Sequence, residues 1–246
     1  MSTSNTRKTL IDLPERESDI QDYLDQYFLS KRMLASELDI EIEEVAELTE
    51  IGFIPSCSYK VENKIIYSYV FGRSRANDCR DDEYFSPSVI SWFKSNSQAY
   101  SLNAKDNHAM AERIRSDFIA KYIEIATHNS HFFNIFRNLN KNDLLEMAER
   151  TWSHHTKGTY GICVRTPSSI EQIISKQVIV EELIQLTQDG QRRNFSKEEW
   201  NTFKISAKKF DQIAMPFSPA DYEKSSRKRL VDNVFCSVNL MDKFGT

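Results

Sequence analysis

Residues 30–56, SKRMLASELDIEIEEVAELTEIGFIPS, decide how the first half of the chain folds. Ser30 can cap a short helix, and Asp39-Ile40 predicts a tight turn after it. A second helix is predicted over 41–51, and it ends at Gly52, a residue typical of helix C-termini. The inward stripe of these helices is formed by Met33, Leu34, Leu38, Ile42, Val45, Leu48 and Ile51. Two short helices joined by a tight turn form a helix-turn-helix unit.

The segments on either side extend this unit. Residues 1–17 predict a flexible arm, and 18–29 predict a first helix. Residues 58–71 are rich in β-branched and aromatic side chains around a central Glu-Asn-Lys turn, which predicts a β-hairpin. A helix-turn-helix followed by a hairpin is the winged-helix pattern. Residues 73–83 are expected to form a polar loop, and a further helix should open at Ser86-Pro87.

From residue 106 onward the apolar periodicity is helical. Short and long helices are expected at about 106–127, 130–139 and 142–154. Ser168 with Glu171, and Ser196 with Glu199, have the spacing of capping boxes at the start of two more helices. A last helix is expected to open at Ser218-Pro219. We therefore predict a mainly α protein, with a small winged-helix-like domain over 18–100 and an all-helical domain over 101–246.

The composition is that of a globular protein. The 246 residues are 40% apolar and 11% aromatic, enough for a substantial core. No apolar run approaches the roughly 18 residues that a bilayer requires, and the polar N-terminus lacks the apolar centre of a signal peptide. The four cysteines are far apart and form no CxxC motif. We expect a soluble, cytoplasmic protein with reduced thiols and no membrane association.

The distribution of charge argues against DNA binding. The net charge of −4 combines 11 − 18 = −7 for residues 1–100 with 21 − 18 = +3 for residues 101–246, counting Lys+Arg against Asp+Glu. Helix 41–51 has five acidic residues and no basic one: Glu41, Glu43, Glu44, Glu47 and Glu50. Most of the affinity for a duplex comes from Lys and Arg on phosphates, and the hairpin region supplies only Lys60, Lys64, Arg73 and Arg75. We expect the unit not to bind DNA, and either to bind a basic protein surface or to pack on the helical domain.

Two resemblances follow from particular stretches. FLSKRMLASELDIEIEEVAELTEIGFIPSCSYKV at 28–61, with GFIP at 52–55, and YFSPSVISWF at 84–93 resemble the start of MerR-type regulators. That resemblance implies a DNA-binding regulator with a ligand-sensing helical domain. Together with the N-terminal segment just quoted, GTYGICVRTPSSI at 158–170 and MPFSPADYEKSSRKRLVDNV at 215–234 resemble an uncharacterised bacterial family of unknown function found near natural-product biosynthesis genes. This second resemblance implies a biosynthetic context and supplies no catalytic residues.

The catalytic candidates cluster around Cys163. A nucleophilic thiol needs a base and a positive environment, which His154, His155 and Arg165 could supply from nearby in the sequence. The alternative is that Cys163, between Ile162 and Val164, is a small buried hydrophobic residue.

The ligand-binding candidates are Trp152, Tyr160, Arg165, Arg227 and Arg229. We expect any pocket to lie between helices, lined by Trp152, His155, Tyr160, Cys163 and Arg227. SSRKRL at 225–230 could hold a phosphate or carboxylate, although a solvated basic face is the alternative.

A metal site is a weaker hypothesis. Glu124, His128 and His131 lie on one side of a helix, but three ligands along a straight helix span about 10 Å, too far for one ion. The alternative is a polar helix end, and we predict no metal. Walker, GxGxxG, GxSxG and HExxH motifs are missing from the sequence, so their reactions have no support.

These observations lead to three functional hypotheses. The first is an accessory or biosynthetic protein of bacterial natural-product metabolism that binds a small acidic ligand or a carrier protein through its helical region. The second is a MerR-like transcription regulator. The third is a non-catalytic scaffold that forms a homodimer. The sequence assigns neither a reaction nor a cofactor.

Overall fold

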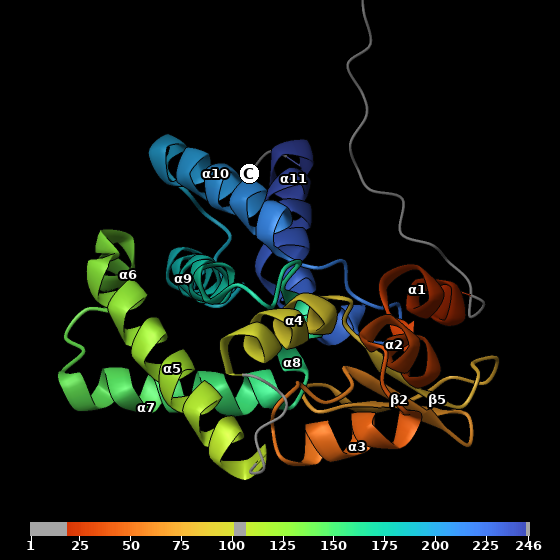
Figure 1. Ribbon diagram of the computed structural model, residues 1–246. Coiled ribbons are helices and arrows are strands. Elements are labelled where there is room, and N and C mark those ends of the chain that lie inside the picture. Colours follow the sequence, from red (N-terminus) through yellow and green to blue (C-terminus); the bar gives the residue numbers. More distant parts are fainter. Residues whose placement is uncertain (1–18, 101–106, 245–246) are drawn as a thin grey trace, which may run out of the picture.

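The computed structural model describes residues 19–100 and 107–244. Most of these residues are helical, and one small five-stranded antiparallel sheet lies in the N-terminal region (Figure 1). The prediction of a mainly α protein is confirmed. The predicted arm at 1–17 lies outside the described residues.

Helices α2 and α3 have the positions predicted for the two short helices. The chain begins with α1 (Asp19–Tyr27) and β1 (Leu29–Ser30), followed by α2 (Lys31–Leu38) and α3 (Ile42–Glu50). The Ser30 hydroxyl accepts a 3.3 Å hydrogen bond from the backbone N–H of Met33, which starts α2. Asp39 ends α2 in the left-handed conformation, with φ = 57°. These local signals explain why the sequence located the two helices.

The sheet is larger than predicted. The expected hairpin is formed by β2 (Tyr59–Glu62) and β3 (Ile65–Ser68), and its turn places Asn63 and Lys64 at positive φ. Two more strands, β4 (Gly72–Arg75) and β5 (Asp82–Phe85), occupy the two ends of the segment expected to be a polar loop. The expectation was wrong there, and residues 76–81 between the strands form the loop. The strand order is β1-β5-β2-β3-β4. Exposed residues such as Arg73 and Arg75 make β4 look like a loop in sequence.

The rest of the chain is helical, and some of its helices begin at the predicted N-cap residue whereas others do not. Ser196 and Glu199 form the predicted capping box, but Ser169 rather than Ser168 caps the preceding helix. The last helix does not begin at Ser218-Pro219, because the hydroxyl of Ser225 caps the next helical turn instead.

The helical elements are α4 (Ser88–Tyr100), α5 (Asn107–His128), α6 (Ser130–Ile135), α7 (Lys141–Thr156), α8 (Thr159–Cys163), α9 (Ile170–Thr187), α10 (Lys197–Ile213), the 3₁₀ turn η1 (Tyr222–Lys224), the π-helical turn η2 (Lys228–Asp232) and α11 (Asn233–Phe244).

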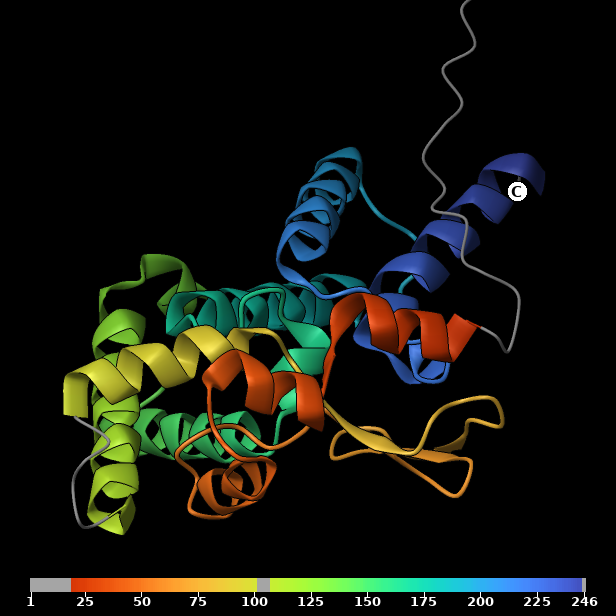
Figure 2. The same ribbon diagram turned by 45° about the vertical axis from the view of Figure 1, so that its right-hand side comes forward.

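Helix α9 lies at the centre of the helical region. It contacts α5, α6 and α10, and the sheet lies on the other side of the molecule beneath α1 (Figures 1 and 2). The largest apolar cluster contains residues of α2, α3, α4, α5, α7 and α9. A division of the chain near residue 100 remains a prediction, but this cluster takes residues from both sides of it.

Candidate functional site

The short helix α8 joins the N-terminal elements to the helical region. Gly158 precedes it at φ = 71°, and a β-carbon there would overlap the carbonyl oxygens of Ser56 and Cys57. The backbone N–H of Ser56 donates to the carbonyl of Thr156 at 2.8 Å. A β-carbon on Gly161 would also overlap the Ser58 hydroxyl. The glycines therefore permit close packing, which buries Tyr160 and leaves Cys163 half-buried.

His155 is part of an aromatic cage. Its ring centroid lies 4.3 Å from that of Trp92, 5.2 Å from that of Phe118 and 5.8 Å from that of Trp152. The residue is 3% exposed, and its Nε2 has no hydrogen-bond partner among the described residues. Burial lowers the pKa of His155 to about 3, so the ring is neutral at neutral pH. This environment favours an aromatic core role over general base catalysis.

His154 points in a different direction from His155. Its ring lies edge-on to Tyr69 and Tyr160, and Nδ1 is 3.4 Å from the Thr159 hydroxyl. Burial first, and then the charge of Lys157, lower its pKa. The two neighbouring histidines therefore do not form one paired site.

The thiol of Cys163 is poorly suited to be a nucleophile. It donates a 3.5 Å hydrogen bond to the carbonyl of Thr159, four residues earlier in the chain. Burial raises its pKa to about 11. A thiol with this pKa is almost fully protonated at pH 7, which favours the alternative of a small buried side chain.

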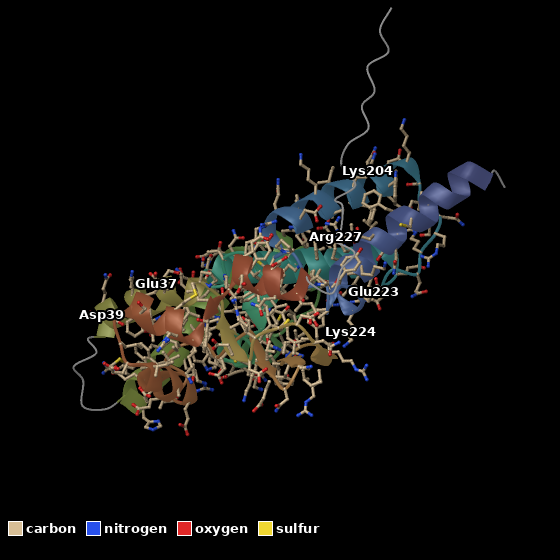
Figure 3. The ribbon with its side chains drawn as sticks, turned by 90° about the vertical axis from the view of Figure 1, so that its right-hand side faces the viewer. Glu37, Asp39, Lys204, Glu223, Lys224 and Arg227 are labelled. Carbon is tan, nitrogen blue, oxygen red and sulfur yellow. The ribbon has the colours of Figure 1, made fainter. Side chains whose placement is uncertain are left out.

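The arginine candidates already have protein partners. Arg227 forms ion pairs with Asp211 and, at 3.0 Å, with Asp232. Arg229 pairs with Asp189, and Arg165 donates to the backbone carbonyl of Asp211 at 3.3 Å. Arg227 and Arg229 therefore do not offer uncompensated positive charge to a small anion. Figure 3 shows Arg227 close to the segment that carries Glu223 and Lys224.

Only part of the expected pocket is assembled. A slot of about 10 Å³, room for roughly one water, is lined by His155 and Tyr160 together with Ser56, Ser58, Ser86 and Ser168. The Tyr160 hydroxyl accepts a 3.2 Å hydrogen bond from Gln177, which also donates to Thr151 at 2.9 Å. Trp152, Cys163 and Arg227 do not line this slot.

Lys176 was missed in the sequence and is the most unusual charged residue of the region. It is 4% exposed, and its Nζ has no hydrogen-bond partner among the described residues. Nζ lies 3.1 Å from the centroid of the Phe210 ring. Its pKa is lowered to about 7, chiefly by burial; Cys163 acts in the opposite direction, and Arg227 contributes a smaller lowering effect. The helical periodicity of the sequence could have indicated its burial, because Lys176 lies three residues after Ile173 and seven before Leu183, on the apolar side of α9.

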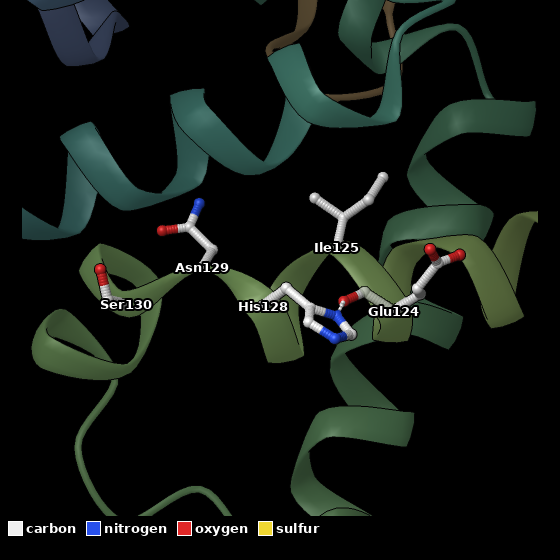
Figure 4. Close-up of a pocket in the computed structure, with 5 residues that line it drawn as sticks. All are labelled: Glu124, Ile125, His128, Asn129 and Ser130. Carbon is white, nitrogen blue, oxygen red and sulfur yellow. Dashed lines mark hydrogen bonds between the residues drawn. The ribbon is translucent and has the colours of Figure 1, made fainter.

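The three metal candidates do not converge. An open hollow of about 450 Å³ is lined by Glu124, Ile125, His128, Asn129 and Ser130. Figure 4 shows these five side chains. His128 Nδ1 lies 2.8 Å from the carbonyl oxygen of Glu124, whose carboxylate pairs with Lys121. His131 instead lies 3.4 Å from Glu182. Within the described ranges, no three His, Cys, Asp or Glu residues are grouped to hold a metal ion.

The outer face of the hairpin exposes apolar and basic side chains together. Ile65 and Tyr67 of β3 point outward, and their cross-strand neighbours on β4 are Arg75 and Arg73. Neither arginine forms an ion pair within residues 19–100 and 107–244. We call this surface the β3–β4 face and define it as Ile65, Tyr67, Arg73 and Arg75 with Tyr69 and Val70 of the following turn. All six side chains are exposed.

The solvent side of α3 has the opposite character. Glu41, Glu43, Glu44, Glu47 and Glu50 are all exposed, and none pairs with a Lys or Arg of the described chain. The neighbouring Glu37 and Asp39 lie at the end of the molecule away from Lys204 (Figure 3).

The comparisons with known proteins place the chain in a family. The sequence model of a family of unknown function, DUF6058, matches residues 114–238, just over half of the 246 residues. The chain belongs to the DUF6058 family. The DUF6058 segment runs from α5 into α11 and contains Tyr160, Cys163, Lys176 and Arg227, whereas α3 and the sheet precede it.

No curated protein and no solved structure matches the chain. None of the helices in the described part of this DUF6058 protein combines the length and apolar character that a bilayer crossing demands.

Proposed function

We propose that this DUF6058 protein is an accessory binding protein of natural-product biosynthesis, and that it binds an acidic carrier protein through the β3–β4 face. The observation that carries the proposal is the combination of exposed apolar side chains with two arginines that have no carboxylate partner in the described chain. The biosynthetic setting rests on the resemblance of residues 158–170 and 215–234 to proteins encoded near such genes.

The composition of the face suits protein recognition. Tyrosine and arginine are enriched among the residues that carry most of the binding energy at protein interfaces. Tyr67 is 43% exposed and lies opposite Arg73, so a partner could cover the ring and pair with the guanidinium together. Guanidinium groups bind carboxylates in a bidentate geometry, which favours an acidic partner surface.

The structure gives less support to a small acidic ligand in the helical region. Arg227 and Arg229 are occupied by Asp211, Asp232 and Asp189. An added anion would have to displace these carboxylates. The β3–β4 face requires no such exchange, so we assign partner binding to it.

DNA is the alternative occupant, and it belongs to the second hypothesis, a MerR-like regulator. The positions of α2, α3 and the β2–β3 hairpin are compatible with such a module. The four exposed glutamates of α3 and Glu41 at its N-cap oppose it, because that helix would have to approach a phosphate backbone.

Binding measurements can separate the two occupants. The chain should be titrated at low salt with a fluorescent acidic acyl carrier protein and, separately, with duplex DNA, with anisotropy as the readout. We expect binding of the carrier protein and a Kd at least tenfold weaker for the double variant Arg73→Glu, Arg75→Glu. The matched control is Arg113→Glu on α5, an exposed arginine away from this face, which should bind like the wild type.

Two outcomes would contradict the proposal. One is equal binding by the wild type and the double variant. The other is tight, steeply salt-dependent binding of DNA without binding of the carrier protein, which would support the regulator.

A further inference from the structure

We propose that Lys176 is a reactive amine that condenses with a small aldehyde to form an imine. The geometry behind this inference is a lysine amine enclosed by aromatic rings and left without a polar partner. It is independent of the β3–β4 face and of the partner proposed to bind there.

The surroundings of the amine are apolar. Nζ lies 3.1 Å from the centroid of Phe210 on α10 and 5.9 Å from that of Phe217, in the segment after α10. The residue is 4% exposed, and no described oxygen or nitrogen hydrogen-bonds Nζ. An ammonium group normally donates three hydrogen bonds, so these surroundings penalise the charged form.

The neighbouring groups act in opposite directions. The Cys163 thiol acts to raise the pKa of Lys176, and Arg227 acts more weakly to lower it. Cys163 is protonated at neutral pH, and the charge of Arg227 is balanced by Asp211 and Asp232. Burial against the aromatic rings is therefore the main effect, and a desolvated lysine holds a substantial neutral fraction near pH 7, as in lysines that form Schiff bases.

The reaction requires nothing beyond the aldehyde. The nitrogen lone pair adds to the carbonyl carbon, the carbonyl oxygen takes up both amine protons, and it leaves as water. R–NH₂ and R′–CHO give R–N=CH–R′ and H₂O. Phe210 and Phe217 make a small apolar aldehyde the best-matched class, because a charged one would lose its hydration without gaining a hydrogen bond.

The test is site-resolved trapping in the intact chain. The protein is incubated with acetaldehyde and cyanoborohydride at pH 6.5 and at pH 10, and ethylation of each lysine is quantified by mass spectrometry. Lys204 of α10 is the internal reference, because it is exposed to solvent (Figure 3). We expect at least fivefold more adduct on Lys176 than on Lys204 at pH 6.5. The preference should narrow strongly at pH 10, where a lysine with the ordinary pKa of about 10.4 is already about 30% neutral.

Two variants make the result specific. Arg227→Gln removes a cation and leaves the carboxylates of Asp211 and Asp232 without their partner, so a larger share of Lys176 is protonated and its adduct at pH 6.5 should fall at least threefold. Lys176→Met should abolish the adduct while carrier-protein binding is unchanged, so the two proposals fail separately. Equal or lower ethylation of Lys176 than of Lys204 at pH 6.5, or no response to Arg227→Gln, overturns the inference.

Discussion

The hydroxyl of Ser58 donates a 2.9 Å hydrogen bond to the carbonyl oxygen of Gly158, one hundred residues further along the chain. Ser58 is buried, and the bond joins the start of the sheet to the start of α8. Gly161 follows one turn later and packs against the same serine. At this point the N-terminal elements and the helical region therefore meet through close contact with the backbone of α8.

This contact predicts a large effect for a single methyl group. Gly161→Ala places a β-carbon against Ser58 Oγ and 2.9 Å from Ser86 Cβ. Overpacking of this kind destabilises a protein by about 1–3 kcal/mol. Urea denaturation should show that loss, and Ser58→Ala in the same chain should recover part of it. A stability equal to that of the wild type would show that the contact is looser than described.

His155→Phe should alter the response of stability to acid. The pKa of His155 is lowered to about 3, so between pH 6.5 and 3 the unfolded state binds a proton that the folded state does not. Because of this difference, the free energy of unfolding of the wild type falls by up to about 1.4 kcal/mol for each unit by which the pH drops through that window. The variant keeps a ring in the cage and removes this proton uptake.

Urea titrations at pH 7.5 and pH 5 can check the histidine prediction. At pH 7.5 the free energy of unfolding of the variant should equal or exceed that of the wild type, because the unpaired Nε2 is gone. The difference in favour of the variant should be larger at pH 5. An identical pH dependence in the two proteins would refute a buried, neutral His155.

The four cysteines should differ widely in reactivity. With a pKa of about 11, the thiol of Cys163 holds only about one part in ten thousand as thiolate at pH 7. Iodoacetamide should therefore alkylate Cys163 at least about 100-fold more slowly than the exposed Cys236. Peptide mass spectrometry over time gives both rates in one sample. Comparable rates would restore Cys163 as a candidate nucleophile.

Tyr59 should stabilise the buried carboxylate of Asp221. Its hydroxyl donates a 2.8 Å hydrogen bond to Asp221, whose pKa is raised chiefly by burial and would be higher without this bond. Tyr59→Phe should lower the free energy of unfolding by about 1.5–3 kcal/mol at pH 7.5. A raised carboxyl pKa means that stability is lost as pH rises above the normal value of about 4, so the cost should be smaller at pH 4.5.

Chemical unfolding at the two pH values tests the tyrosine prediction. Tyr84→Phe is the matched control, since the Tyr84 hydroxyl bonds neutral groups, the carbonyl of Arg80 at 3.2 Å and the amide of Gln21 at 3.3–3.4 Å, and not a carboxylate. Tyr84→Phe should lower the free energy of unfolding by less than Tyr59→Phe does, and by the same amount at both pH values. A loss for Tyr59→Phe that is independent of pH would show that Asp221 is not the group affected.

Much of the helical framework could be read from local sequence. Ser30 and Ser196 cap helices at the expected positions, and the Asn63-Lys64 turn closes the expected hairpin. Each of these signals depends on hydrogen bonds between residues a few positions apart. Strand β4 escaped prediction because it is an edge strand whose partner, β3, supplies the pairing and whose own residues are mostly polar.

The candidate site was less accessible to prediction. Cys163, His155 and Arg227 were selected as reactive types, yet burial, an aromatic cage and ion pairs change what each can do. Lys176 was overlooked because an isolated lysine in a long helix is ordinarily solvated.

By itself, the sequence determined the mainly α composition, most helix starts and the acidic solvent side of α3, because spacing, capping and charge are properties of neighbouring residues. Only the tertiary structure decided that Arg229 is neutralised by Asp189, that His155 is neutral and that Lys176 is enclosed by Phe210. Pairing and protonation depend on solvent exclusion and on groups brought together from distant parts of the chain, which no local pattern records.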